Sequence, residues 1–138
     1  MPPEIVRLVR ARAGSRCEYC RMPVGVHPAP FQIDHVVARQ HGGSSDADNL
    51  AFCCMHCNRY KGPNIAGIDP QTGGVVRLFH PRRDHWAEHF AWEGNKIVGV
   101  SRVGAVTLGL LQMNAPEVVA LRVELEVESE GEDSGLVN

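Results

Sequence analysis

Four cysteines stand in two Cys-x-x-Cys pairs, one near the start of the chain and one near residue 55. The two-residue spacing puts two thiolates on one tight turn, so both can bind the same ion. Two such pairs supply the four soft ligands of a tetrahedral zinc site with no open position. The sequence therefore predicts a structural zinc ion held by Cys17, Cys20, Cys54 and Cys57.

A fifth cysteine, Cys53, is adjacent to Cys54 and makes the register of the second pair a question. Cys54 has the two-residue spacing to Cys57, so we interpret Cys53 as a small buried residue. The N-terminus has no secretory apolar region, which favours metal binding over disulfides for these pairs. Because 33 residues separate Cys20 from Cys54, the zinc would close a long loop.

An Asp-His pair, Asp34 and His35, lies inside this loop at the end of the run FQIDHVVA. An imidazole can take a proton from water at neutral pH, and a carboxylate offers a hard oxygen to Mg²⁺ or Mn²⁺. Asn58, directly after Cys57, offers an amide oxygen. Two protein ligands would leave the remaining positions of the ion for water and phosphate oxygens. These groups suit the hydrolysis of a phosphodiester.

The segments IDHVVARQHGG, DNL and CCMHCNRYKG occur in this order and resemble the HNH nuclease motif. His35 would be its first residue, Asn49 its middle residue, and Asn58 would replace the final His. The Cys-x-x-Cys pairs resemble the zinc-bound subgroup, and LFHPRRDHWAEHFAWEG resembles the extension of some small bacterial HNH proteins. The resemblance, over residues 17–62, implies a ββα-metal fold. A hairpin would carry Asp34, His35 and Asn49, and the following helix would carry Asn58.

The resemblance also implies a metal-dependent endonuclease that acts on DNA. His35 would be the general base, Asp34 and Asn58 would hold Mg²⁺ or Mn²⁺, and Asn49 would steady the loop and the imidazole. Taken singly, these residues would more often be a surface pair, a turn residue and a helix cap. Two alternatives stay open, a non-catalytic zinc module that binds nucleic acid or protein and a nuclease that acts on RNA. The complete set favours an enzyme, since binding alone needs no general base.

Charge is distributed unevenly along the chain. Residues 1–83 hold 11 Lys and Arg against 6 Asp and Glu, a net +5, whereas residues 84–138 hold 3 against 10, a net −7. The basic part suits a polyanionic partner such as nucleic acid, and the acidic end suits a solvated tail. Phosphate contacts are expected from Arg39, His41, Arg59 and Lys61, with a solvated loop or helix face as the alternative.

Periodicity and turn signals predict the elements that must position these residues. The helix expected after Pro2 or Pro3 has the apolar stripe Ile5, Leu8 and Val9 and ends at Gly14. Strict alternation along the strand at 31–38 would place Asp34 and His35 on opposite faces, so both serve one site only if the strand ends or twists there. The remaining elements expected are a strand at 49–53, a helix at 55–61, hairpins at 68–79 and 91–100, a helical stretch at 84–90 capped by Asp84, and a helix at 101–114 capped by Ser101. At 115–128 the Glu content and Pro116 favour a helix, and the alternation of apolar residues leaves a strand as the alternative.

The length of 138 residues suits one domain. We expect an α+β domain over residues 1–128, with a motif core at 17–62 and an extension at 63–128, followed by an acidic disordered tail at 129–138. The apolar runs are too short to span a bilayer, and a cytoplasmic location is the expectation. The oligomeric state is left open by the sequence.

Overall fold

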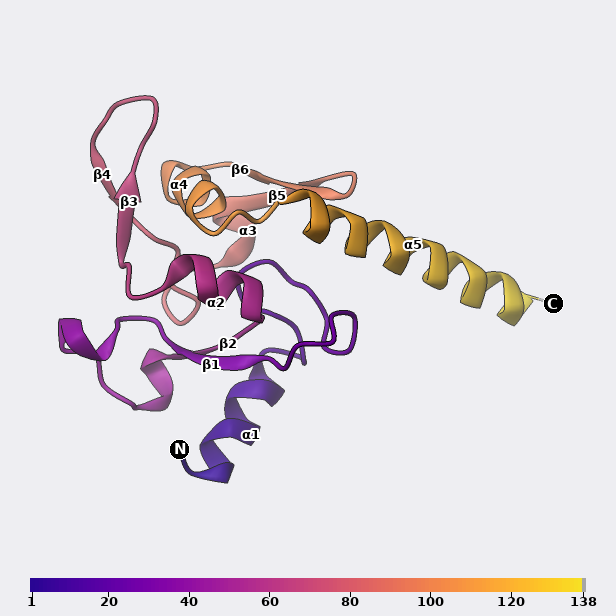
Figure 1. Cartoon of the computed structure of the whole chain (residues 1–138), viewed down its shortest axis with the longest axis horizontal. Coiled ribbons are helices and arrows are strands. Elements are labelled where there is room, and N and C mark those ends of the chain that lie inside the picture. Colours follow the sequence, from indigo (N-terminus) through magenta and orange to yellow (C-terminus); the bar gives the residue numbers. More distant parts are fainter. Residues whose placement is uncertain (138) are drawn as a thin grey trace.

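The segment between the cysteine pairs folds into an antiparallel hairpin, and a helix follows it (Figure 1). In this computed structural model, β1 (Gln32–His35) pairs with β2 (Leu50–Cys53), and α2 (Met55–Lys61) begins after Cys54. The structure describes the backbone of residues 1–137 and the side chains of residues 1–127. The expected ββα order and the α+β class are confirmed.

The two faces of the hairpin pack against different partners, α1 on one side and α2 on the other (Figure 1). Leu50 and Phe52 alternate along β2 and pack on α1 (Pro3–Arg12). Ala51 and Cys53, on the opposite face, belong to the core around the cysteines. Alternate residues of the hairpin therefore face either α1 or the core around the cysteines.

The apolar face of α1 differs in part from the predicted stripe. Val9 is fully buried, Ala13 is buried and Ile5 packs against the same cluster, whereas Leu8 is 48% exposed. The contact face therefore follows a spacing of four residues rather than three, because only one row of this short helix reaches the hairpin. Gly14, with φ +66°, follows the C-cap Ala13 as expected.

The loop from β1 to β2 contains two 3-10 helices, η1 (Arg39–His41) and η2 (Ala47–Asn49). Asn49 is buried and clamps the loop, because its Oδ1 accepts from Val37 N at 2.9 Å and its Nδ2 donates to the carbonyls of Val37 at 2.9 Å and Ser44 at 2.7 Å. Gly42 has φ +84°, a conformation that favours glycine. At Gly43 a side chain would collide with the Val37 carbonyl oxygen. The Gly-Gly pair thus lets the loop close on Asn49.

The extension adds two hairpins and three helices to this core. Both predicted hairpins are confirmed, as Gly67 pairs with Val76 in the first and Trp92 with Ile97 in the second. The elements are β3 (Ala66–Ile68), β4 (Val75–Arg77), α3 (Trp86–His89), β5 (Phe90–Glu93), β6 (Lys96–Gly99), α4 (Arg102–Leu110) and α5 (Pro116–Val137). The end of α5 leads away from the other elements (Figure 1).

Several expectations for the extension are tested by these elements. Ser101 caps α4 as predicted, through a bond from Gly104 N to its Oγ at 2.9 Å. Asp84 does not cap α3, which was a wrong prediction, because its carboxylate binds Arg77 at 2.7 and 3.1 Å and His80 N at 2.8 Å. The helix expected at 115–128 is confirmed by α5.

The predicted tail at 129–138 coincides with the last residues of α5, whose backbone continues to Val137. The side chains of this segment lie outside the described residues, and the proposed division into domain and tail stays a prediction. Among the helices of residues 1–137, none combines the length and apolar character needed to cross a membrane.

Substituting Gly43 tests whether the loop clamp contributes to stability. A Cβ atom there would lie 1.7 Å from the Val37 carbonyl oxygen and 2.9 Å from Asn49 Nδ2. Gly43→Ala should therefore lower the free energy of unfolding by about 2 kcal/mol or more, measured by denaturant unfolding with zinc present. In the control Gly109→Ala, the new Cβ meets no atom within 4 Å in α4, so stability should stay equal or rise by up to about 1 kcal/mol. Equal stability of the two variants would contradict the close approach.

Candidate active site and zinc centre

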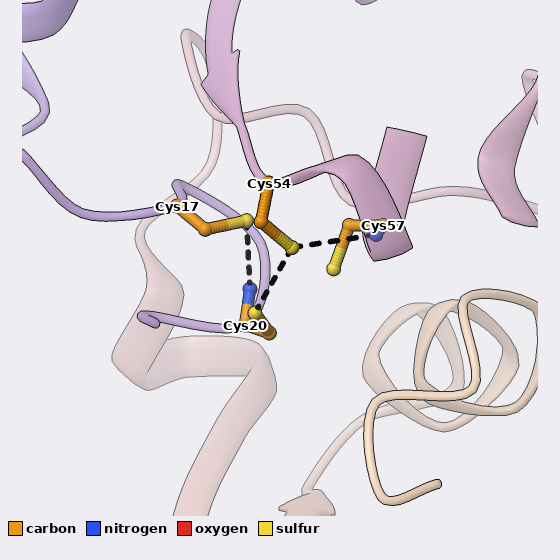
Figure 2. Close-up of side chains that lie close together, drawn as sticks. All are labelled: Cys17, Cys20, Cys54 and Cys57. Carbon is orange, nitrogen blue, oxygen red and sulfur yellow. Dashed lines mark hydrogen bonds between the residues drawn. The ribbon is translucent and has the colours of Figure 1, made fainter. Parts of the chain in front are cut away.

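The two cysteine pairs converge from separate parts of the chain (Figure 2). Cys17 and Cys20 come from the loop after α1, whereas Cys54 and Cys57 come from the start of α2. The four Sγ atoms lie within 4.8 Å of one another, and all four side chains are buried. Cys20 Sγ and Cys54 Sγ are 3.7 Å apart. Two sulfurs, each about 2.3 Å from a tetrahedral zinc ion, would be about 3.8 Å apart, so the cluster fits zinc.

Backbone amides point at these sulfurs in the way that suits thiolates. Cys20 N donates to Cys17 Sγ at 3.5 Å, and Cys57 N donates to Cys54 Sγ at 3.4 Å (Figure 2). Hydrogen bonds with neighbouring cysteines, first of all Cys17, hold the pKa of the Cys20 and Cys57 thiols well above the ordinary value. Four thiolates would therefore require a cation among them, which a zinc ion would supply.

Cys53 lies outside this cluster, as the spacing predicted. Its side chain is fully buried, and its Sγ donates to the Cys54 carbonyl oxygen at 3.3 Å. Cys54, in contrast, is also the N-cap of α2, because its Sγ accepts the bond from Cys57 N. The same sulfur can thus start the helix and bind the metal, and the predicted register is confirmed.

Asp34 lies on the α2 side of the hairpin, where its carboxylate is 6% exposed. Tyr19 OH donates to Asp34 Oδ2 at 2.8 Å, and Lys61 Nζ lies 3.2 Å from the same oxygen and 3.4 Å from Oδ1. Burial raises the pKa of Asp34, while the positive charge of Lys61 and the Tyr19 hydroxyl partly oppose that rise. The carboxylate is thus held in the interior by one cation and one hydroxyl.

His35, the next residue, lies at the end of β1 and is half-buried. It pairs with Leu50, whose side chain faces α1, so alternation places the imidazole on the face opposite Asp34. Its Nε2 lies 3.0 Å from Ser45 Oγ in the loop that Asn49 clamps. His35, the predicted general base, and Asp34, the predicted metal ligand, therefore point to opposite faces of β1, as strict alternation requires. Because β1 ends at His35, the imidazole reaches the loop beyond the strand.

Asn58 joins Asp34 at the interface between β1 and α2. Its Nδ2 donates to Gln32 Oε1, and Gln32 lies two residues before Asp34 on the same face of β1. Lys61 lies one helical turn after Asn58, so both α2 residues face the strand at successive positions. The structure thereby brings Asp34 and Asn58 to one interface, as the resemblance implied.

The donor set at this interface fits a hard divalent cation. A carboxylate, an amide oxygen and backbone carbonyls are the ligands that Mg²⁺ and Mn²⁺ accept. A cation already stands among such oxygens, because Lys61 Nζ lies near both Asp34 oxygens and 3.4 Å from the His35 carbonyl oxygen. A divalent ion at Asp34 would therefore have to share this position with the lysine ammonium.

Sequence reasoning missed four contacts at this site. Tyr19, from within the first Cys-x-x-Cys, holds Asp34, and Gln32 holds Asn58. Ser45 contacts the imidazole of His35, a role that was assigned to Asn49, whose own bonds go to the loop backbone. Lys61 pairs with Asp34. Alternation could have indicated Gln32, but the other three pairings depend on how the loops close.

The predicted phosphate contacts divide into exposed and buried residues. Arg39 and His41 in η1 and Arg59 in α2 are exposed, so they can meet a ligand from solvent. Lys61 is 1% exposed and turns inward to Asp34, which differs from the predicted surface position. Its ammonium is held there by the Asp34 carboxylate and the His35 carbonyl oxygen of β1.

A family model described as HNH endonuclease matches residues 17–64. The match includes both cysteine pairs, the β1–β2 hairpin and α2, and it agrees with the resemblance seen in the sequence. No curated protein and no solved structure matches the chain. The family match points to nuclease chemistry on nucleic acid.

Zinc content tests the metal centre directly. The purified protein should contain about one zinc per chain, and Cys54→Ser should lose it together with much of the stability, since the site then lacks a ligand and α2 its sulfur cap. Cys53→Ser should keep the metal, because its sulfur lies outside the cluster. Metal analysis and thermal melting would check both variants. Loss of zinc from Cys53→Ser with retention in Cys54→Ser would reverse the assignment.

Proposed function

We propose that this protein is an endonuclease that hydrolyses phosphodiester bonds in DNA with the help of Mg²⁺ or Mn²⁺. One observation carries the proposal. Asp34 and Asn58 both lie where β1 packs on α2, Asp34 against Lys61 and Asn58 against Gln32, while His35 reaches from the end of the same strand to Ser45 in the following loop. A hydrolase of phosphodiesters needs a base for the attacking water and a site for a cation, and in this proposal His35 and Asp34 serve one phosphate where β1 ends.

His35 is the group that would take the proton from water. Ser45 Oγ lies 3.0 Å from Nε2, so a water that gives its proton to this nitrogen would take the place of the serine hydroxyl. The Ser45 hydroxyl also fixes the direction of the ring. Asn49 supports this arrangement from a distance, because it clamps the loop that carries Ser45 through Val37 and Ser44.

Asp34 and Asn58 are the side chains that would hold the divalent ion, which when bound neutralises the charge that builds on the phosphate. Asp34 contributes a charged oxygen and Asn58 a neutral one. Their relative position depends on how α2 lies on β1. Because Cys54 and Cys57 bracket the first turn of α2, zinc would fix the helix that carries Asn58.

Charge and exposure support a nucleic-acid substrate. Arg39 and His41, in the loop after His35, and Arg59, next to Asn58 in α2, are exposed, and residues 1–83 carry a net charge of +5 from 11 basic and 6 acidic residues. Phosphate contacts of this kind bind DNA and RNA alike. We choose DNA as the substrate, and RNA is the alternative to be tested beside it. A zinc module that only binds nucleic acid needs no general base, so a histidine in the first position of the motif favours an enzyme.

Replacing His35 tests the catalytic assignment. His35→Ala should lower the rate of plasmid cleavage in Mg²⁺ or Mn²⁺ by roughly 10²–10⁴-fold, the usual contribution of general-base catalysis. Zinc content and thermal melting should stay as in the wild type, because the imidazole lies at the edge of the fold. His85→Ala is the matched control, since His85 is an exposed histidine far along the chain at the start of α3.

The same assay distinguishes the alternatives. Cleavage of a structured RNA but not of plasmid DNA would identify RNA as the substrate. Binding of DNA or RNA without cleavage would favour the non-catalytic zinc module. A fully active His35→Ala variant with unchanged metal dependence would rule out this residue as the base.

Salt dependence tests the interaction with the phosphate backbone. Binding of a DNA duplex by His35→Ala should weaken steeply as salt rises, because binding releases counterions from DNA. Arg39→Gln should weaken binding and reduce this dependence, whereas Arg102→Gln should not, because Arg102 is paired with Asp69 in the extension. Fluorescence anisotropy at several salt concentrations would measure both effects. Affinity independent of salt would contradict the proposed basic surface.

A further inference from the structure

Lys61 is a buried lysine in a chain that has two lysines in all. Its side chain is 1% exposed at the end of α2, whereas Lys96 on β6 is exposed. Lysine is among the residues least often buried, and a buried ammonium needs compensating partners. The position of Lys61 therefore requires a physical reason.

The partners of the ammonium are oxygens of β1. Nζ lies 3.2 Å from Asp34 Oδ2, 3.4 Å from Asp34 Oδ1 and 3.4 Å from the His35 carbonyl oxygen. Charge-assisted hydrogen bonds are usually shorter, about 2.7–2.9 Å. The ammonium thus occupies an oxygen-lined position without the close contacts of a tight ion pair. A carboxylate beside a backbone carbonyl is also a normal ligand set for a divalent cation.

We propose that Lys61 is an internal counter-ion that a divalent cation must displace from Asp34 before the site becomes active. This inference rests on the proposed function, because it concerns the ion expected at Asp34. Two cations bound to one buried carboxylate repel each other strongly where little water screens them. The lysine therefore sets how tightly the site binds metal.

A cleft beside Lys61 provides room for the displaced side chain. Its volume is about 300 Å³, and Lys61 lines it together with Arg77, His80, Arg83 and Asp84 of the extension. Asp84 is paired with Arg77, while Arg83 is exposed. An ammonium released into this cleft would join Arg83 at a surface that a substrate phosphate can reach. Lys61 would thereby exchange its carboxylate partner for a phosphate. This exchange would explain how a lysine that is buried in the free protein can make the phosphate contact expected from the sequence.

Amine labelling of the wild-type, zinc-loaded protein tests the displacement without relying on activity. Acetic anhydride modifies exposed lysines, and mass spectrometry reports each lysine separately. Labelling of Lys61 should be low without Mg²⁺ and should rise by roughly tenfold or more at saturating Mg²⁺, because the buried amine becomes accessible. Lys96 is the internal control and should be labelled equally in both conditions.

Direct binding of Mn²⁺ provides the second measurement. If the ammonium occupies the site in about nine of ten molecules, its removal raises the apparent affinity about tenfold. Lys61→Gln should therefore bind Mn²⁺ about tenfold more tightly in an electron paramagnetic resonance titration, Lys96→Gln should equal the wild type, and Asp34→Asn should lose the site. Thermal melting with zinc analysis confirms that each variant is folded.

The outcomes separate this proposal from the proposed function. The displacement would be overturned if cleavage depends on Mg²⁺ while Lys61 stays protected from labelling at saturating Mg²⁺. It would also be overturned if Lys61→Gln binds Mn²⁺ with the affinity of the wild type. Either result would leave the proposed nuclease activity intact. Failure of every variant to bind Mn²⁺ would overturn the displacement and the divalent ion in the proposed function together. Raised labelling of Lys61 that follows the Mn²⁺ binding curve would support the displacement.

Discussion

The four-cysteine centre is the constraint on which the arrangement of the site depends. It ties the loop after α1 to the junction of β2 and α2, and Cys54 both binds in the cluster and caps the helix. At the β1–α2 interface Lys61 pairs with Asp34 and Asn58 with Gln32, and α2 has fewer than two full turns beyond its cap. A helix this short is not stable alone. A zinc ion in this centre would therefore fix the position of α2 on β1 without being part of that interface.

The two residues between the first cysteines extend this constraint to the whole molecule. Glu18 Oε2 accepts from Phe52 N at 2.8 Å, and its other oxygen pairs with Arg82 of the extension. The Tyr19 carbonyl accepts from Trp86 Nε1 at 2.8 Å, while its hydroxyl holds Asp34. One tight turn thus joins the metal centre, β2, the extension and the buried carboxylate. The extension is consequently a support of the site, and its loops also form the cleft beside Lys61.

The parts of this structure that the sequence predicted are those with local causes. Cysteine spacing indicated the zinc ligands, including the choice of Cys54 over Cys53, and turn glycines and alternation indicated the hairpins. The parts that escaped prediction depend on distant contacts. Lys61 is buried because it pairs with Asp34, which is 27 residues away in the sequence. Asp84 does not cap α3 as expected because its carboxylate pairs with Arg77 of β4. Leu8 is exposed because the hairpin accepts only the row of Ile5, Val9 and Ala13.

Asp34 has a structural role in the interior, and its two partners explain how it could also serve the proposed metal site. A buried carboxylate tends to become protonated, since burial raises its pKa, and Lys61 and Tyr19 counteract that tendency. An ionised carboxylate is the form that binds a cation, so the pairing with Lys61 preserves the ligand while it also competes for it. Removing Asp34 would leave a buried, unpaired ammonium, which is far costlier than losing a surface charge. The conservative change to Asn, which keeps the size and an oxygen, therefore separates metal binding from folding better than truncation does.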